Sequence, residues 1–492
     1  NPNKEWHIGH ARNCILGDVV GRLYRRAGHQ VEIQNYIDDT GVQVADIIVG
    51  FLYLDMKPEI EGTKFDHYCG DEVYVKVNEM YEESPELLER RKEVLRQLEE
   101  GEGPIAEFAE KVIKRVVEEQ LKTCWRLGSE YDLLNWESHI LRTGYWREVF
   151  EELKRKGFIE LAKEGKYAGC WVIKGQEGEE KVLVRSDGTA VYAAKDIPYA
   201  AWKLGLLEDR FGYDVFTEQP SGEKLWTTVA RGGKREHPRF NDGDMAITII
   251  DVRQSRVQKF VSMAVKALGG EGKEYVHLGY EVVALSKDTA DELGVKVKED
   301  REFYHMSGRK GLYVNVDDVL DELEKRAREE SRVRNPDEDE RWIAEVGRKV
   351  AIGALRYALL KQDLEKIIIF DMKEALRLEG DTGPYLQYSL ARAYRILEKA
   401  GQFEPRSDLG KHLVAEEERA LVLMMSKYEK VLLEAVKNLS PKRLANYARE
   451  LAVSFNQFYE KRPVLQEKDE RVRSARLALV KAYTELYSDL LE

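Results

Sequence analysis

Hydrophobic positions repeat at helical spacing directly after the first ten residues. These positions are Ile15, Leu16, Val19, Val20 and Leu23. A short run over residues 31–36 then has the length and composition of a strand. A helix that feeds a strand is half of a βαβ unit, so the pattern predicts an α/β fold with a parallel sheet.

Residues 65–134 interrupt this pattern with charged, amphipathic segments. Over 86–100 and 105–127, apolar residues lie three and four positions apart, which is typical of helices with one buried face. We expect a helical insertion in the sheet. The basic run from Lys111 to Arg115 has two interpretations, a phosphate contact or a solvated helix face.

Two further transitions from strand to helix follow the insertion. Residues 182–184 predict a strand, which a Ser-Asp-Gly turn at 186–188 connects to a helix. Residues 246–252 predict a second strand, and 257–268 predict the helix after it. Ligands of open α/β sheets bind at the ends of such strands, so these loops are candidate ligand sites.

The last third of the chain is predicted to be almost entirely helical. The helical stretches are 342–360, 382–400, 415–438, 440–459 and 470–491. We place a domain boundary in segment 321–341, which is dense in both charge signs. Most aromatic residues of the bundle fit a core, while a few exposed rings could stack on unpaired bases. These rings are Tyr385, Tyr388, Tyr394, Phe455, Phe458 and Tyr459.

Composition narrows the class of protein. The 492 residues are 43% hydrophobic and 34% charged, as in a globular protein of two or three domains. No apolar run has the length of a membrane span. The four cysteines show neither zinc-ligand nor redox spacing, which favours a reducing, cytoplasmic location. The net charge of −12 argues against non-specific nucleic-acid binding, but not against a local basic face.

The segment His7-Ile8-Gly9-His10 carries the first candidate chemistry. Two imidazoles three residues apart at a helix start can donate hydrogen bonds to phosphate, which the helix N-terminus also attracts. Gly9 leaves no side chain between the backbone and a bound ring. Two alternatives remain open on this motif alone, a pair of helix-capping histidines and a metal-binding pair.

Three later sites add candidate chemistry: a residue pair, a glutamine and a loop. Tyr192 and Asp196 are four apart on a helix, where a phenol beside a carboxylate could seat a guanidinium. The alternative is an ordinary surface pair. Gln254 could bond a polar substrate or cap its helix. The loop from His305 to Gly311 is basic and bracketed by glycines, so it could neutralise a triphosphate or be a simple turn.

Several ordered blocks, weak alone, together carry a resemblance. They are residues 1–12, 182–196, 306–311, 379–388, 455–459 and 475–480. In these blocks the chain resembles the class I aminoacyl-tRNA synthetases, and specifically the arginyl-tRNA synthetase family. The resemblance implies a Rossmann-type catalytic domain with a helical insertion, followed by an all-helical anticodon-binding domain. We expect the catalytic domain over 1–340 with the insertion at 65–140, connecting helices over 341–383, and the anticodon-binding domain over 384–492.

The same resemblance implies an arginine–tRNA ligase. Arginine would attack ATP, with Mg²⁺ accompanying the nucleotide, to give arginyl-adenylate. The arginyl group would then pass to tRNA(Arg), a step that serves translation. We expect a cytoplasmic monomer without a structural metal. Two other hypotheses are a tRNA-binding module without catalysis and a small-molecule nucleotidyltransferase.

Site residues carry over from the family by position. His7, Gly9 and His10 match the first ATP-binding signature. The second signature corresponds to Met306, Ser307, Gly308, Arg309 and Lys310. The arginine-binding positions are Asn1, Tyr192, Asp196 and Gln254.

Two departures from the family qualify this expectation. The second signature begins with His305 instead of lysine and has Gly308-Arg309 instead of lysine-serine. Relatives with this change carry a lysine three residues before the first histidine, so Lys4 is implied as the compensating catalytic cation. The family also has an N-terminal domain and a strand before this point. We therefore expect a part of a longer protein, and the alternative function is a catalytically impaired tRNA-binding fragment.

Overall fold

The computed structural model describes the chain except for residues 175–179, 187–191, 231, 296–302, 306–313 and 404–406. The chain divides into two compact units. The first unit contains residues 1–6 and 32–281, and the second contains residues 7–31 and 282–492. Within the described parts, every helix is too short or too polar to traverse a bilayer.

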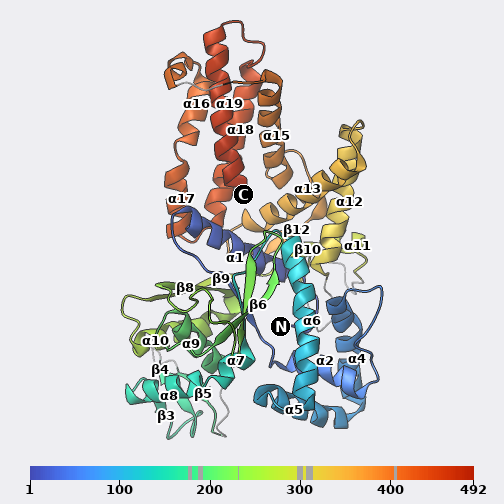
Figure 1. The fold of residues 1–492 in the computed structure, drawn as a ribbon, viewed down its shortest axis with the longest axis vertical. Coiled ribbons are helices and arrows are strands. Elements are labelled where there is room, and N and C mark those ends of the chain that lie inside the picture. Colours follow the sequence, from blue (N-terminus) through green and yellow to red (C-terminus); the bar gives the residue numbers. More distant parts are fainter. Residues whose placement is uncertain (175–179, 187–191, 231, 296–302, 306–313, 404–406) are drawn as a thin grey trace. The chain divides into compact units, whose positions relative to one another are not determined.

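Parallel pairing organises the first unit. One sheet has the order β1-β2-β7-β6, in which β1, β2 and β7 run parallel and β6 is antiparallel to β7. Of these four strands, β6 is labelled in Figure 1. A separate parallel pair joins β8 to β9. The bounds are β1 Gln34–Ile37, β2 Leu133–Trp136, β6 Gly212–Glu218, β7 Lys224–Val229, β8 Met245–Asp251 and β9 Glu274–Tyr280. The strand predicted at 31–36 begins only at Gln34, because the Ile33 N–H donates to the Asp132 carboxylate.

The insertion is helical, as the apolar spacing predicts. Its helices are α3 Phe65–Tyr68, α4 Val75–Glu83, α5 Pro85–Glu100 and α6 Pro104–Arg126, with a π-helical turn at Cys69–Tyr74. They share an apolar core with α2 (Val42–Tyr53). Arg115 of the basic run donates to the Pro58 carbonyl at 2.6 Å and stacks over the Phe65 ring. Arg115 is therefore bound to neighbouring protein groups, whereas Lys111 and Lys114 of the same run are exposed, as a solvated helix face predicts.

The remaining elements of the first unit surround a second core. They are α7 Glu137–Arg142, α8 Tyr145–Arg155, β3 Ile159–Leu161, β4 Trp171–Lys174, β5 Glu180–Val184, α9 Tyr192–Lys203 and α10 Ser255–Leu268. Strands β3, β4 and β5 form an antiparallel sheet. The two predicted strand-to-helix transitions are confirmed by β5 with α9 and by β8 with α10. The turn predicted at 186–188 lies partly outside the described residues.

The second unit begins with α1 (Ile8–Arg26) and contains a small sheet of order β11-β10-β12. The bounds are β10 Val283–Ser286, β11 Phe303–His305, β12 Ile368–Phe370, α11 Lys287–Glu292, α12 Val316–Arg334, α13 Glu340–Leu360 and α14 Met372–Ala375. The charge-dense segment 321–341 forms parts of α12 and α13, which pack on each other around the turn at 335–339. The domain limits given above stay predictions.

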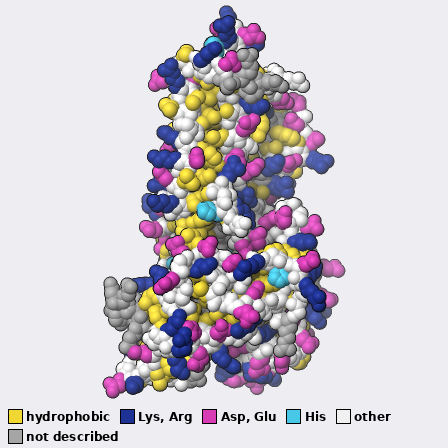
Figure 2. All heavy atoms as spheres, turned by 60° about the vertical axis from the view of Figure 1, so that its left-hand side comes forward, with side chains coloured by type: hydrophobic (Ala, Val, Ile, Leu, Met, Phe, Trp, Pro, Cys, Tyr) yellow, Lys and Arg dark blue, Asp and Glu magenta, His cyan; other side chains and the backbone are white. Residues whose placement is uncertain are grey.

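A helical domain completes this unit. Its helices are α15 Gly383–Ala400, α16 Glu416–Met425, α17 Tyr428–Lys437, α18 Pro441–Lys461 and α19 Glu470–Leu491, with a 3-10 turn at Ser407–His412. The single helix predicted at 415–438 is wrong, because the chain breaks at Ser426, whose hydroxyl donates to the Leu423 carbonyl. Figure 2 shows apolar side chains on this domain's surface, where Leu423 and Leu433 are exposed.

Candidate active site

The two histidines of the signature form the N-terminal cap of α1. The Gly9 N–H donates to His7 Nδ1 at 3.0 Å, and the His7 N–H donates to His10 Nδ1 at 3.2 Å. The rings stack with centroids 3.7 Å apart. Because each Nδ1 accepts a hydrogen bond, the neutral rings carry their proton on Nε2. The capping interpretation is thus correct, and it also prepares two Nε2–H donors for an anion.

The local sequence favours the binding of an anion at the N-terminal end of α1. The first turn of α1 contains no acidic residue that would neutralise the positive end of the helix dipole, so this end can attract an anion. At Gly9 an added Cβ would lie 2.8 Å from His7 Cε1, so only glycine lets this ring fold over the helix start. His7 also forms a β-bridge with Asn315, five residues after Lys310. Met306, Ser307, Gly308, Arg309 and Lys310 themselves lie outside the described residues.

Lys4 and Asn1 belong to the first unit. The Gln120 side-chain amide donates to the Lys4 carbonyl at 2.7 Å and to the Asn1 carbonyl at 3.2 Å, which fixes the backbone of this segment. Burial lowers the pKa of the Lys4 ammonium, while Glu5 and Asp71 partly raise it again. The side-chain amide of Asn1 contacts Gln43 at 3.3 Å.

A buried carboxylate, Glu137, lies at the end of β2. It accepts hydrogen bonds from the Tyr36 hydroxyl at 2.5 Å and from Thr40, and it pairs with Lys195 at 2.6 Å. Beside it, Asp39 accepts from Ser138 through both the backbone N–H and the hydroxyl. The sequence-based prediction missed Glu137. Its position directly after a strand parallel to β1 is the signal that could have found it.

Asp196 on α9 lies beside Gln258 of α10. The Gln258 amide donates to Asp196 Oδ2 at 3.2 Å, and the Tyr275 hydroxyl holds the other end of that amide at 2.6 Å. Burial raises the pKa of Asp196 to about 6. Gln254 lies four residues before Gln258, at the end of the 3-10 turn Val252–Gln254. Tyr192 begins α9, but its side chain lies outside the described residues.

A cluster of rings and one guanidinium lies on the helical domain. Arg392 of α15 stacks between the exposed rings of Tyr388 and Tyr459, at 4.8 and 4.4 Å from their centroids. Its Nη1 donates to Asn456 at 2.7 Å, and Asn456 donates to the Tyr385 hydroxyl at 3.0 Å. These hydrogen bonds fix the position of Arg392 in what we call the aromatic platform (Tyr388, Arg392 and Tyr459). Phe455 and Phe458 are core residues, as most of the rings were predicted to be.

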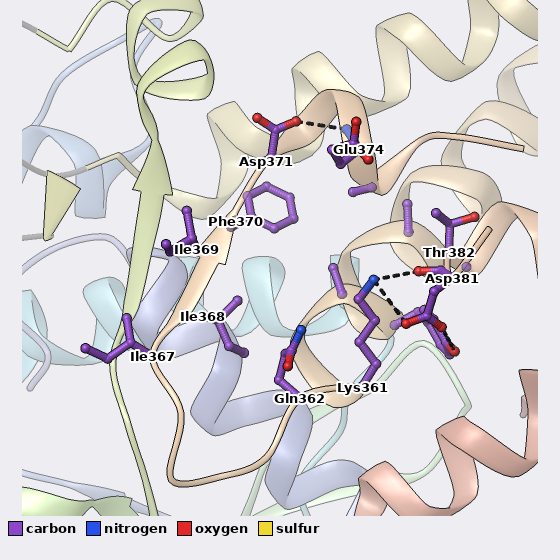
Figure 3. A pocket seen from close by; sticks show the side chains of 15 residues that line it. Lys361, Gln362, Ile367, Ile368, Ile369, Phe370, Asp371, Glu374, Asp381 and Thr382 are labelled. Atoms are coloured by element: carbon purple, nitrogen blue, oxygen red, sulfur yellow. Dashed lines mark hydrogen bonds and ion pairs between the residues drawn. The ribbon is translucent and has the colours of Figure 1, made fainter. Parts of the chain in front are cut away.

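The second unit also contains a cavity of about 350 Å³ beside β12 (Figure 3). Lys361 points toward Asp381 across it and donates to the Asp381 carbonyl at 2.6 Å. The Tyr357 hydroxyl donates to the Asp381 carboxylate at 2.7 Å. None of the site residues predicted from the sequence lines this cavity.

Comparisons with known proteins agree over the whole chain. The family model "tRNA synthetases class I (R), catalytic domain" matches residues 1–219, and "DALR anticodon binding domain" matches residues 386–492. The arginine–tRNA ligase of Thermococcus sibiricus is 37% identical, with 100% of this chain and 78% of that relative covered. The ligase of Deinococcus radiodurans is 38% identical, with 100% of this chain and 80% of that relative covered.

A solved structure gives the same result. The Thermus thermophilus arginyl-tRNA synthetase superposes with a TM-score of 0.86 at 35% identity, covering 100% of this chain and 79% of that one. The fold and the histidine signature define a class I aminoacyl-tRNA synthetase, which confirms the predicted fold class.

Within that class, the chain belongs to the arginyl-tRNA synthetase family. The predicted activity, arginine–tRNA ligase, is confirmed. The catalytic-domain match favours this enzyme over a tRNA-binding module without catalysis.

Proposed function

We propose that His7 and His10 bind the phosphates of ATP through their Nε2–H groups. In the first step a carboxylate oxygen of arginine attacks the α-phosphorus, the bond from that phosphorus to the bridging oxygen breaks, and pyrophosphate leaves. Negative charge grows on the phosphate oxygens, which the Nε2–H donors and the end of α1 stabilise. The two Nδ1 hydrogen bonds support this assignment, since they fix the donor tautomer in advance.

We propose the other nucleotide contacts from the places of these residues in the two ATP-binding signatures of the family. Gly9 lets the adenine-nucleotide approach the backbone, and the second signature from Met306 to Lys310 supplies cations to the triphosphate. Lys4 stabilises the α-phosphate charge. Its partial burial supports the assignment, because a half-buried ammonium interacts more strongly with an anion than one in open water does. Mg²⁺ is proposed to accompany ATP as part of the substrate complex.

Arginine is proposed to bind through Asp196, with Tyr192, Gln254 and Asn1 completing its contacts. Asp196 presents a carboxylate whose Oδ1 accepts no hydrogen bond from the described residues, while Gln258 holds Oδ2. A guanidinium can therefore donate to the open oxygen.

In the second step the terminal 2′-hydroxyl of tRNA attacks the arginyl carbonyl, and AMP leaves. We propose that the aromatic platform on the helical domain stacks on unpaired bases of the anticodon loop. Exposed rings with a guanidinium between them suit base stacking. We also propose that the protein works in the cytoplasm as a monomer. The four free cysteines support a reducing location.

The experiment that tests this function is aminoacylation of bulk tRNA with each amino acid supplied separately. We expect charging with arginine alone, dependent on ATP and Mg²⁺. Binding of tRNA(Arg) without any charging would instead support the tRNA-binding alternative.

A further inference from the structure

Helix α1 carries the two histidines at its start, and the rest of the helix packs on other helices of the second unit. It packs against α13, α17 and α18 of the same compact unit. Its Leu23 is buried in a small core with Leu432, Ala435 and Val436 of α17. Near its end, Arg26 pairs with Asp489 of α19.

Two polar contacts hold the part of α1 before Leu23. Arg12, only two residues after His10, is fully buried and donates to the carbonyls of Lys366, Asp363 and Leu364 at 3.2 to 3.4 Å. Lys442 of α18 pairs with the Asp363 carboxylate at 2.8 Å. The first turn of α1 is thereby tied to the helical domain through one short segment.

The second attachment is a buried ion pair. Asp18 is 5% exposed and accepts from Arg356 of α13 at 2.5 Å and from Arg22 at 2.9 Å. At 1.5 Å of rise per residue, this carboxylate lies about 12 Å along the helix from His10. Burying a charged pair costs desolvation and adds little stability by itself, so a structural role alone explains it poorly.

We propose that Arg12 and Asp18 are positioning residues for the first reaction step. They hold α1 against α13 and segment 363–366, and so fix the first turn of α1, which carries His7 and His10. This proposal rests on the ATP-contacting role proposed above for the two histidines.

The test measures ATP–pyrophosphate exchange with arginine at saturating tRNA(Arg), using the full chain. Asp18→Asn keeps the side-chain size but breaks the ion pair. We expect kcat to fall about tenfold or more, because a misplacement of about 1 Å can cost two orders of magnitude. The Kd for tRNA, measured at fixed salt, and the KM for arginine should stay within about twofold. An unchanged kcat overturns the proposal.

Two further variants separate positioning from general destabilisation. The control Glu418→Gln breaks a buried pair with Arg476 that joins α16 to α19. It should lower Tm without lowering kcat, and an equal loss of kcat there overturns the proposal. The double variant Asp18→Asn with Arg356→Met removes both charges of this pair, so Tm should recover while kcat stays low. Recovery of kcat together with Tm overturns it as well.

A last arm tests the underlying role of the histidines. His10→Ala should abolish exchange. Normal exchange in His10→Ala refutes the ATP contact itself, whereas an inactive His10→Ala with a normal Asp18→Asn refutes only the positioning by α1.

Discussion

Replacing Asp196 by asparagine removes one negative charge from the proposed arginine seat and keeps the contact with Gln258. Removing one partner of a buried, hydrogen-bonded charge pair costs about 2 to 5 kcal/mol. Asp196 is only half-buried, and Gln258 already occupies one of its oxygens, so we take about 3 kcal/mol. The kcat/KM for arginine should therefore fall about 150-fold.

The assay is ATP–pyrophosphate exchange with arginine and ATP varied separately. The KM for ATP should change by no more than about twofold. The matched control is Asp214→Asn, which removes a half-exposed carboxylate from β6 and should leave both parameters unchanged. Equal losses for arginine and ATP in Asp196→Asn would refute the recognition role.

The raised pKa of Asp196 gives this prediction a second readout. A carboxyl whose pKa is about 6 loses its charge as the pH falls through 6, so kcat/KM for arginine should fall on that acid side. This fall of kcat/KM at low pH should be absent in Asp196→Asn. Because burial disfavours the ionised form, the charge costs stability above pH 6 and nothing below the unfolded pKa. The variant should therefore unfold at an equal or higher Tm at neutral pH.

Two further predictions concern ATP and tRNA. Lys4→Ala should lower kcat for adenylate formation about 100-fold, as the loss of one stabiliser of transition-state charge does, and normal adenylate formation would remove Lys4 from the mechanism. Arg392→Ala should raise the tRNA Kd about tenfold, because the rings of the aromatic platform lose the group between them. The control Arg395→Ala, an exposed arginine of the same helix, should bind tRNA normally, and equal weakening in both variants would contradict the platform's role.

Local sequence signals predicted the elements that local interactions decide. The start of α1 follows from a motif in which His7 itself caps the helix. Helices α5 and α6 begin at prolines, which suit the first helical turn, and their apolar spacing marks one buried face. The break between α16 and α17 could not be predicted this way, since the apolar pattern continues across Ser426.

Contacts between distant segments account for what the sequence did not predict. Glu137 meets Tyr36 only because β1 and β2 are neighbours in the sheet. Gln258 reaches Asp196 because α10 packs on α9, a contact that spacing along the chain cannot predict. The pair of Asp18 and Arg356 joins residues more than 300 positions apart, so neither residue carries a local sign of its partner.

The most direct measurement of the central claim is the amino-acid specificity of tRNA charging by this chain. Supplied with ATP, Mg²⁺ and bulk tRNA, it should attach arginine to the 3′ end of tRNA(Arg) and no other amino acid to any tRNA. Charging with a different amino acid, or none with arginine while tRNA(Arg) still binds, would contradict the account.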